Sequence, residues 1–279
     1  MTYRELYDWG TIRLNDADIA EAALDARLLL EYVCHTDRNA LLAHGERPVE
    51  AVWETAYRSL VEDRACHIPL QQILHSQEFM GIEFYVNQNV LIPRQDTEIL
   101  VEEVMREPFD GARILDLCTG SGCILLSLLH YSNGSTGTGV DLSKEALAVA
   151  KENADRLGLQ ERTEWIESDL FTQVSGRYDL LVSNPPYIRR DVIGTLAPEV
   201  REHEPLMALD GGEDGLMFYR EILKKAPVFL YPGARIYLEI GYDQAAEVTA
   251  LMKQNGVQEI RVVQDYAGLD RVVCGILEE

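Results

Sequence analysis

The stretch Ile114-Leu115-Asp116-Leu117-Cys118-Thr119-Gly120-Ser121-Gly122 decides the fold of this chain. Its first half is apolar and predicts a buried strand, and Gly120 and Gly122 predict a tight turn that opens a helix. Cys118 and Cys123 stand where a dinucleotide-binding Gly-x-Gly-x-x-Gly motif would have its first and last glycines. Glycine lets a ligand approach the backbone closely. The turn therefore indicates either a cofactor site or a strand-to-helix turn that needs glycine only for packing.

Strand and helix patterns alternate from residue 113 to the end of the chain. Strands are expected at 113–117, 138–142, 163–168, 178–183, 234–240, 259–263 and 271–277, and helices at 124–130, 144–157 and 244–255. No helix separates the last two strands, so that pair is expected to be antiparallel. This alternation predicts the α/β class, with a doubly wound, Rossmann-like sheet and an antiparallel last strand.

The first part of the chain has the pattern of a small helical bundle. Thr2 and Glu5 fit a capping box at the start of its first helix. The aromatic segment that follows the bundle predicts a β-hairpin, with turn residues at Asn87–Asn89. Asp96 or Thr97 is expected to cap the next helix. The predicted domains are a helical domain at 1–70, a β-hairpin linker at 71–93 and the main domain at 94–279.

The composition is strongly acidic, with 25 basic and 47 acidic residues and a net charge of −22. Proteins that grip nucleic acid usually present a basic face, so the charge argues against DNA or RNA as the main partner. No apolar run reaches the ~18 residues of a transmembrane helix, and the start lacks a signal-peptide core. The five cysteines form no Cys-x-x-Cys pair and the six histidines show no ligand spacing. We expect a cytoplasmic monomer with reduced thiols, no metal ion and no membrane segment.

A second motif, Asn184-Pro185-Pro186-Tyr187, ends the strand expected at 178–183. Its two prolines remove two N–H donors and fix φ, so the chain must leave the sheet there. The rigid loop presents free carbonyls, one carboxamide and one aromatic ring. These groups suit a planar ligand that carries an NH2, such as a nucleobase amine or a side-chain amide. The alternative is a plain turn, because Asn-Pro is a common turn opener.

Three strand ends at the same edge of the sheet each carry an acid, namely Asp116, Asp141 and Asp169. Asp116 adds negative charge where a pyrophosphate would sit, so a cationic cofactor without phosphate fits better, and S-adenosylmethionine (SAM) is one. Asp141, about 20 residues beyond the glycine turn, can accept both ribose hydroxyls. Asp169 can accept from the adenine amine, with Leu170 against the ring. Taken singly, Asp141 could be a helix cap and Asp169 a loop cap. The expected cofactor residues are Asp116, Cys118, Thr119, Gly120, Ser121, Gly122, Asp141, Leu142, Asp169, Leu170 and Asn184.

Together these motifs resemble the class I SAM-dependent methyltransferases, and within them the HemK/PrmC protein-glutamine methyltransferases. The resemblance runs from about Pro69 to the C-terminus, and the helical N-terminus matches in size and character. It also rests on 90–94 with 96–98, 204–205, 211–215, 238–241 and 267–271. It implies methylation of the glutamine of a Gly-Gly-Gln motif in class I peptide-chain release factors, which the N-terminal domain holds. Two positions are less typical of the family, Cys118 where glycine is frequent and Leu170 where a larger residue packs on the ring.

The resemblance also implies a mechanism at the Asn-Pro-Pro-Tyr motif. Asn184 Oδ1 and the Pro185 carbonyl would each accept one N–H of the acceptor amide, beside Pro186, and Tyr187 would pack on the amide plane. No catalytic histidine or cysteine is expected. Two alternatives stay open: an adenine or guanine amino methyltransferase acting on nucleic acid, and a SAM-binding module without catalysis. The acidic charge and the lack of a basic or aromatic recognition segment weigh against the first.

Overall fold

The computed structural model describes residues 1–278, which divide into two compact units. The first unit comprises Met1–His75 together with Ala197–His203, and the second comprises Ser76–Leu196 and the chain from Glu204 onward. The predicted domain boundaries after residues 70 and 93 stay predictions. Within the described residues no helix is long and apolar enough to cross a membrane.

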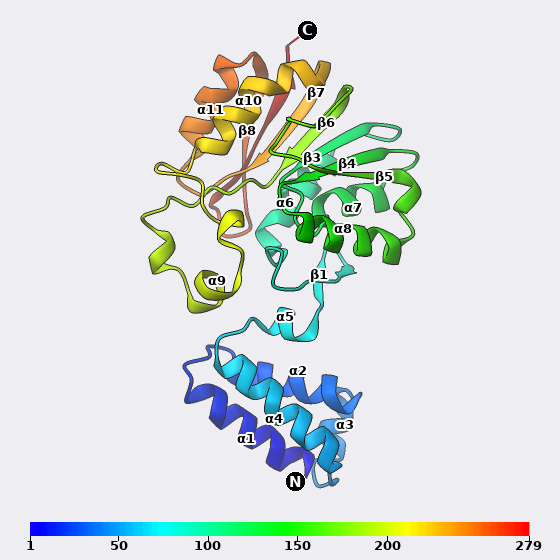
Figure 1. The fold of residues 1–279 in the computed structure, drawn as a ribbon, viewed down its shortest axis with the longest axis vertical. Coiled ribbons are helices and arrows are strands. Elements are labelled where there is room, and N and C mark those ends of the chain that lie inside the picture. Colours follow the sequence, from blue (N-terminus) through cyan, green and yellow to red (C-terminus); the bar gives the residue numbers. More distant parts are fainter. Residues whose placement is uncertain (279) are drawn as a thin grey trace. The chain divides into compact units, whose positions relative to one another are not determined.

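The first unit is a helical bundle (Figure 1). Its helices are α1 (Tyr3–Asn15), α2 (Ala22–Cys34), α3 (Arg38–Ala43), α4 (Ala51–Ala65) and α5 (Leu70–Leu74), with α9 (Pro198–His203) from later in the chain. The predicted capping box is confirmed, because Thr2 Oγ1 accepts from the Glu5 amide at 3.3 Å and the Thr2 amide donates to Glu5 at 2.8 Å. The core is apolar, with Leu6, Leu14, Leu29, Leu30 and Tyr57 fully buried.

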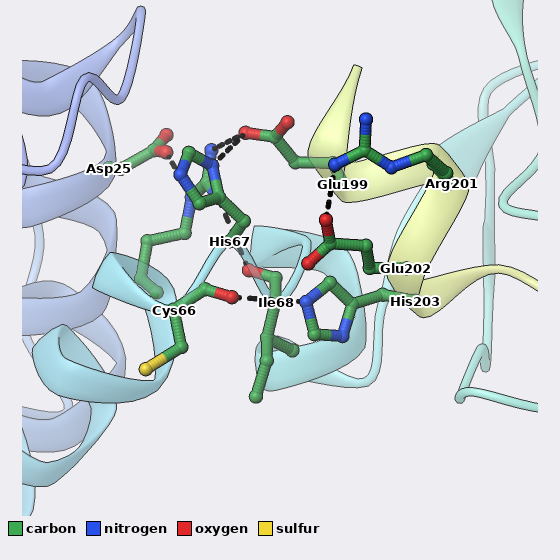
Figure 2. A network of polar contacts seen from close by, with 9 residues as sticks. Asp25, Cys66, His67, Ile68, Glu199, Arg201, Glu202 and His203 are labelled. Carbon is green, nitrogen blue, oxygen red and sulfur yellow. Dashed lines mark hydrogen bonds and ion pairs between the residues drawn. The ribbon is translucent and has the colours of Figure 1, made fainter. Parts of the chain in front are cut away.

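Helix α9 is held in this unit by a buried arginine. Arg64 Nε donates to Asp25 at 2.8 Å, and Arg64 Nη2 donates to Glu199 of α9 at 3.1 Å. The side chains of Arg64 and Asp25 are each only 8% exposed. Burial raises the pKa of Asp25, and the adjacent guanidinium opposes that shift. Figure 2 shows Glu199 and His203 reaching from α9 toward His67 and the Cys66 carbonyl. One buried cation therefore pairs with two carboxylates, and Glu199 has His67 as a further partner.

Replacing this arginine should destabilise the first unit. In Arg64→Met, Asp25 loses its buried cation and Glu199 loses a donor, so the free energy of unfolding should fall by about 3 kcal/mol. Urea unfolding followed by circular dichroism measures the change. Arg13→Met is the matched control in the same unit, because the Arg13–Glu62 pair is solvent-exposed and should contribute far less. Equal losses in the two variants would contradict the role assigned to Arg64.

The second unit contains a seven-stranded sheet in the order β5-β4-β3-β6-β7-β9-β8. The strands are β3 (Arg113–Leu117), β4 (Thr136–Asp141), β5 (Thr163–Glu167), β6 (Tyr178–Ser183), β7 (Leu230–Glu239), β8 (Val257–Gln264) and β9 (Asp270–Leu277). Neighbours from β5 to β7 pair in parallel, while β9 is antiparallel to both β7 and β8. The predicted fold class and the antiparallel last pair are confirmed.

Helices cover both faces of this sheet (Figure 1). One face carries α6 (Gln95–Met105), α7 (Cys123–His130) and α8 (Lys144–Leu157), and the other carries α10 (Met217–Phe229) and α11 (Ala245–Gln254). Three short 3-10 helices complete the unit, at Gln160–Arg162, Ile193–Thr195 and Leu206–Ala208. Successive strand residues face opposite cores, as Ile114 and Leu115 do in β3. Because both faces are covered, Ile114, Leu115 and Leu117 of β3 are all buried.

The hairpin before α6 differs from the prediction. Its strands are β1 (Gln77–Phe79) and β2 (Ile82–Phe84), and the turn between them is Met80–Gly81. Both turn residues have positive φ, 52° and 70°, which suits a two-residue hairpin loop. Asn87–Asn89 forms only a local turn, in which Asn87 Oδ1 accepts from the Asn89 amide at 2.9 Å. The turn of the hairpin is therefore set by Gly81 and not by the asparagines at 87 and 89.

Candidate active site

A pocket of about 270 Å³ lies where the carboxyl ends of β3, β4, β5 and β6 meet. Of the residues predicted from the sequence, it is lined by Cys118, Thr119, Gly120, Ser121, Asp141, Leu142, Asp169, Leu170, Asn184 and Pro186. Asp116, Gly122, Pro185 and Tyr187 do not line it. Parallel strands bring residues far apart in sequence to one edge, as expected for ligand sites in open α/β sheets.

The two glycines of the first motif have different roles. Gly120 has a φ of 54°, and a Cβ added there would meet no atom within 4 Å. Gly122 has a φ of 79°, and a Cβ there would press against Leu126 and Trp165 at 3.1 Å. Gly120 thus leaves room for a ligand, whereas Gly122 serves packing. Cys118 also takes a positive φ, 59°, which is a conformation that favours glycine.

Asp116 is a completely buried carboxyl beneath the pocket. Its Oδ2 accepts from the Thr119 hydroxyl, while Oδ1 has no hydrogen-bond partner among the described residues. Burial raises the pKa of Asp116 to about 7, although the Thr119 hydrogen bond opposes the shift. A buried acceptor without a partner is costly. The site therefore fits a ligand that brings a donor, above all a cationic one.

The carboxylate of Asp141 is fixed at the pocket by two backbone amides. Its Oδ2 accepts from Gly120 and its Oδ1 from Ser143, both at 2.9 Å. Ser143 Oγ accepts from the Ala146 amide at 3.0 Å, so Ser143 rather than Asp141 caps α8 through its side chain. Asp169 caps its own turn with its backbone carbonyl, which accepts from Thr172. Both acids thus reach the pocket without serving as helix caps.

Asn184 is held by a residue of α6. Its Nδ2 donates to Thr97 Oγ1 at 3.3 Å. The predicted capping of α6 by Asp96 or Thr97 is wrong: Arg94 is the N-cap residue, and it makes no side-chain capping bond. Thr97 is therefore the third residue of the helix, and its hydroxyl faces the Asn-Pro-Pro-Tyr motif instead.

Tyr187 lies behind the pocket. Its hydroxyl donates to Glu239 Oε1 at 3.3 Å, and its carbonyl accepts from Gln244 Nε2 at 3.0 Å. A Cβ on Gly211 would come within 2.8 Å of the Tyr187 backbone, and one on Gly215 within 2.4 Å of its carbonyl. These contacts explain why the 211–215 segment requires glycine. The hydrogen bonds of Tyr187 to Glu239 and Gln244 hold the loop after Asn184 in place.

Two family models match the chain. One, the PrmC N-terminal domain, covers residues 5–74, and the other, the methyltransferase small domain, covers residues 94–198. The release factor glutamine methyltransferase of Agrobacterium fabrum is 42% identical over 94% of this chain and 92% of its own length. That of Geobacter sulfurreducens is also 42% identical, over 98% of this chain and 96% of its own. The chain belongs to the release factor glutamine methyltransferases.

Solved structures agree on the fold. A methyltransferase from Pyrococcus furiosus aligns with a TM-score of 0.53 at 14% identity, over 72% of this chain and 91% of its own. A methyltransferase complexed with S-adenosylhomocysteine aligns with a TM-score of 0.52 at 13% identity, over 72% of this chain and 57% of its own. The family assignment confirms the resemblance inferred from the motifs, and this family member is a methyl-transferring enzyme.

Several pocket residues of this methyltransferase were not predicted as site residues. They are Asn89, Val90, Leu91, Pro93, Arg94, Thr97, Pro205, Met207, Ala208, Asp210 and Phe218, among others. Arg94 Nη2 donates to both oxygens of Glu204 at 2.7 Å, and the Ile92 amide donates to the same carboxylate at 3.3 Å. This ion pair joins the segment before α6 to the segment after residue 204. The signal was present, because both segments contribute to the family resemblance.

The raised pKa of Asp116 should appear in the stability of the methyltransferase. The folded state holds this proton more tightly than the unfolded chain, so the contribution is full below pH ~4 and is lost as pH rises through about 7. Asp116→Asn lacks this dependence, so between pH 5 and 8 its stability should rise relative to the original chain by about 2–3 kcal/mol. Urea unfolding at several pH values measures the difference.

Asp110→Asn serves as the control for this titration. Hydrogen bonds from Asn133 lower the pKa of Asp110, so its contribution is lost only as pH falls below its ordinary range. The stability difference for this variant should therefore stay flat between pH 5 and 8. A flat difference for Asp116→Asn over the same range would contradict the assignment.

Proposed function

We propose that this enzyme methylates the side-chain amide nitrogen of the glutamine in the Gly-Gly-Gln motif of class I release factors, with SAM as methyl donor, as a cytoplasmic monomer. The observation that carries the proposal is the anchored carboxamide of Asn184. Because Nδ2 is engaged with Thr97, Oδ1 is the end left to accept from a substrate. The relatives named above are release factor glutamine methyltransferases that match over nearly their full length, and this supports a release factor as the acceptor.

Several pocket residues, together with the buried Asp116, fit SAM by the chemistry of their groups. The unpartnered Oδ1 of Asp116 suits the ammonium of the cofactor, and the open space at Gly120 lets its backbone come close. Asp141 would accept from the ribose hydroxyls, Asp169 from the adenine amine, and Leu170 would face the ring. SAM, when bound, supplies the methyl group that its sulfonium carries.

The protein must make a poor nucleophile react. Resonance delocalises the lone pair of an amide nitrogen, and in a peptide it opposes rotation by ~18–20 kcal/mol. Asn184 Oδ1 and the Pro185 carbonyl would accept one N–H each, but two such bonds contribute only about 1 kcal/mol each. Alignment of the reacting groups can supply up to ~7–11 kcal/mol, so it carries the larger share. A methylated amide nitrogen is acidic enough to lose its surplus proton without a side-chain base.

The first unit would hold the release factor, as the family resemblance implies. No direct contact with nucleic acid is proposed, because the net charge of −22 opposes phosphate binding. An adenine or guanine acceptor is the second candidate, since it presents the same planar NH2 to Asn184. The assay below includes both kinds of acceptor.

Affinity for SAM should rise with pH. A cation beside Asp116 favours its ionised form, so binding below the pKa of about 7 must release a proton. The dissociation constant should fall by up to about tenfold per pH unit from pH 5 to 7 and then level off. Isothermal titration calorimetry in two buffers measures the affinity and the proton released. Asp116→Asn should bind more weakly with a much smaller pH dependence, and an unchanged slope would sink this role.

Asn184→Ala should lower the turnover rate roughly 100-fold or more, because the reacting amide of the substrate would no longer be held in position. SAM binding, measured separately, should weaken much less. The measurement is intact-peptide mass spectrometry of a release factor incubated with enzyme and SAM, with parallel incubations of DNA and rRNA. One added methyl on the Gly-Gly-Gln peptide supports the proposal. Near-normal turnover by the variant, or methylation of nucleic acid instead, would overturn it.

A further inference from the structure

We infer that Gln244 is a positioning residue for methyl transfer: its carboxamide holds the backbone of Tyr187 and thereby sets where the Asn-Pro-Pro-Tyr loop presents Asn184 to the acceptor amide. The inference rests on the proposed function, because it takes Asn184 as a group that holds the substrate. Gln244 does not line the pocket and was not among the site residues predicted from the sequence. Its part in the reaction is therefore indirect, through the loop.

The carboxamide of Gln244 is buried and bonded to three backbone groups. Only 7% of the residue is exposed. Its Nε2 donates to the carbonyl of Tyr187 at 3.0 Å and to that of Gly215 at 3.3 Å, and its Oε1 accepts from the Gly241 amide at 2.9 Å. A carbonyl only accepts and a backbone N–H only donates, so these partners fix which way the carboxamide faces. A flipped carboxamide would lose all three bonds.

Gln244 does not use this side chain to cap its own helix. It is the N-cap residue of α11, yet it makes no side-chain capping bond. Asn255, the C-cap residue of the same helix, behaves differently, because its Nδ2 donates to the Leu251 carbonyl within α11 at 2.7 Å. Glutamine is also not among the residues preferred at an N-cap. Helix capping therefore does not explain why a glutamine stands at position 244.

Two glycines leave the room that this carboxamide occupies. A Cβ on Gly215 would come within 2.5 Å of Gln244 Nε2, and a Cβ on Gly241 would stand 3.1 Å from Gln244 Oε1. Gly241 does not have a positive φ, so the close contact and not the backbone conformation favours glycine there. The segments 211–215 and 238–241, which both contribute to the family resemblance, thus meet the Asn-Pro-Pro-Tyr loop at one side chain.

The backbone that Gln244 holds is coupled closely to the reacting groups. The two prolines of the motif have fixed φ angles, so the chain between Asn184 and Tyr187 has few ways to absorb a shift at either end. The Tyr187 hydroxyl bonds to Glu239, which holds the ring, whereas Gln244 holds the main chain itself. Misplacing the reacting groups by about 1 Å can cost about 100-fold in rate. Release of the Tyr187 carbonyl should therefore lower the rate of methyl transfer more than the affinity for either substrate.

The test begins with Gln244→Met, which keeps the length of the side chain and removes all three hydrogen bonds. The kcat for release factor methylation should fall at least about tenfold, while KM for the release factor and Kd for SAM stay within about threefold. Asn255→Met is the matched control at the other end of α11, and it should lose stability but keep kcat within about twofold. An unchanged kcat in Gln244→Met, or an equal loss of kcat in both variants, would overturn the inference.

A double-mutant cycle separates positioning from general damage. If Gln244 acts through the loop that carries Asn184, adding Gln244→Met to Asn184→Ala should lower the residual kcat by less than about threefold. A full tenfold further loss would mean that Gln244 acts independently of Asn184, and the inference would then be wrong.

Gln244→Glu replaces Gln244→Met if the latter does not fold by circular dichroism. Glutamate keeps an acceptor for the Gly241 amide, but it has at most one donor, against two in glutamine, for the carbonyls of Tyr187 and Gly215. Its kcat should therefore fall at least about threefold with Kd for SAM retained. An unchanged kcat would mean that the donors of Gln244 do not position the loop.

Asn184→Ala distinguishes a failure of this inference from a failure of the proposed function. An Asn184→Ala enzyme with near-normal turnover would remove the proposed role of the Asn-Pro-Pro-Tyr motif, and the role of Gln244 with it. An inactive Asn184→Ala enzyme together with a fully active Gln244→Met enzyme would remove the role of Gln244 alone. Both variants are therefore measured on the same release factor at saturating SAM.

Discussion

A carboxyl group buried in an apolar sheet must find donors or a cation, or remain protonated. Two such groups, Asp116 in β3 and Glu239 at the end of β7, shape the active site of this methyltransferase. Each has one oxygen without a hydrogen-bond partner among the described residues, and burial raises the pKa of each to about 7. Asp116 leaves one oxygen without a partner next to the pocket-lining Cys118, whereas Glu239 accepts from the Tyr187 hydroxyl.

Most strands and helices of the second unit could be predicted from the sequence to within two residues, although β7 begins four residues before the expected start at 234. The ranges expected for β3, β6 and α8 are those observed, because an apolar run or helical spacing is bounded there by glycine, proline or a serine cap. Helix α10, Met217–Phe229, was not predicted. It contains Pro227 in its last turn and follows a glycine-rich loop, and both features look like breaks in a sequence. Packing of its apolar face against the sheet outweighs those local signals.

Site residues could be predicted from the sequence only where a single short motif contains them. The glycine turn and the Asn-Pro-Pro-Tyr loop are local, so most of their residues line the pocket as expected. Thr97 and Glu239 lie in segments that carry the family resemblance, but neither was predicted as a site residue, because a threonine near a helix start looks like a cap and a lone glutamate in a strand looks like a surface residue. Only the placement of α6 brings Thr97 to Asn184, and only the pairing of β6 with β7 brings Glu239 near Tyr187. Such contacts depend on topology rather than on sequence spacing.

The residues that follow Tyr187 are bonded to residues near 210, although some twenty residues of chain lie between them. The Ile188 amide donates to Leu209 at 3.0 Å, and the Gly211 amide donates back to Ile188 at 2.8 Å. Glu204 is fixed in addition by Arg94. These bonds lie within the second unit, so the segment 189–208 begins and ends at neighbouring points of that unit. Helix α9, in the middle of this segment, can therefore belong to the helical unit, while the ends of the segment keep their own hydrogen bonds in the second unit.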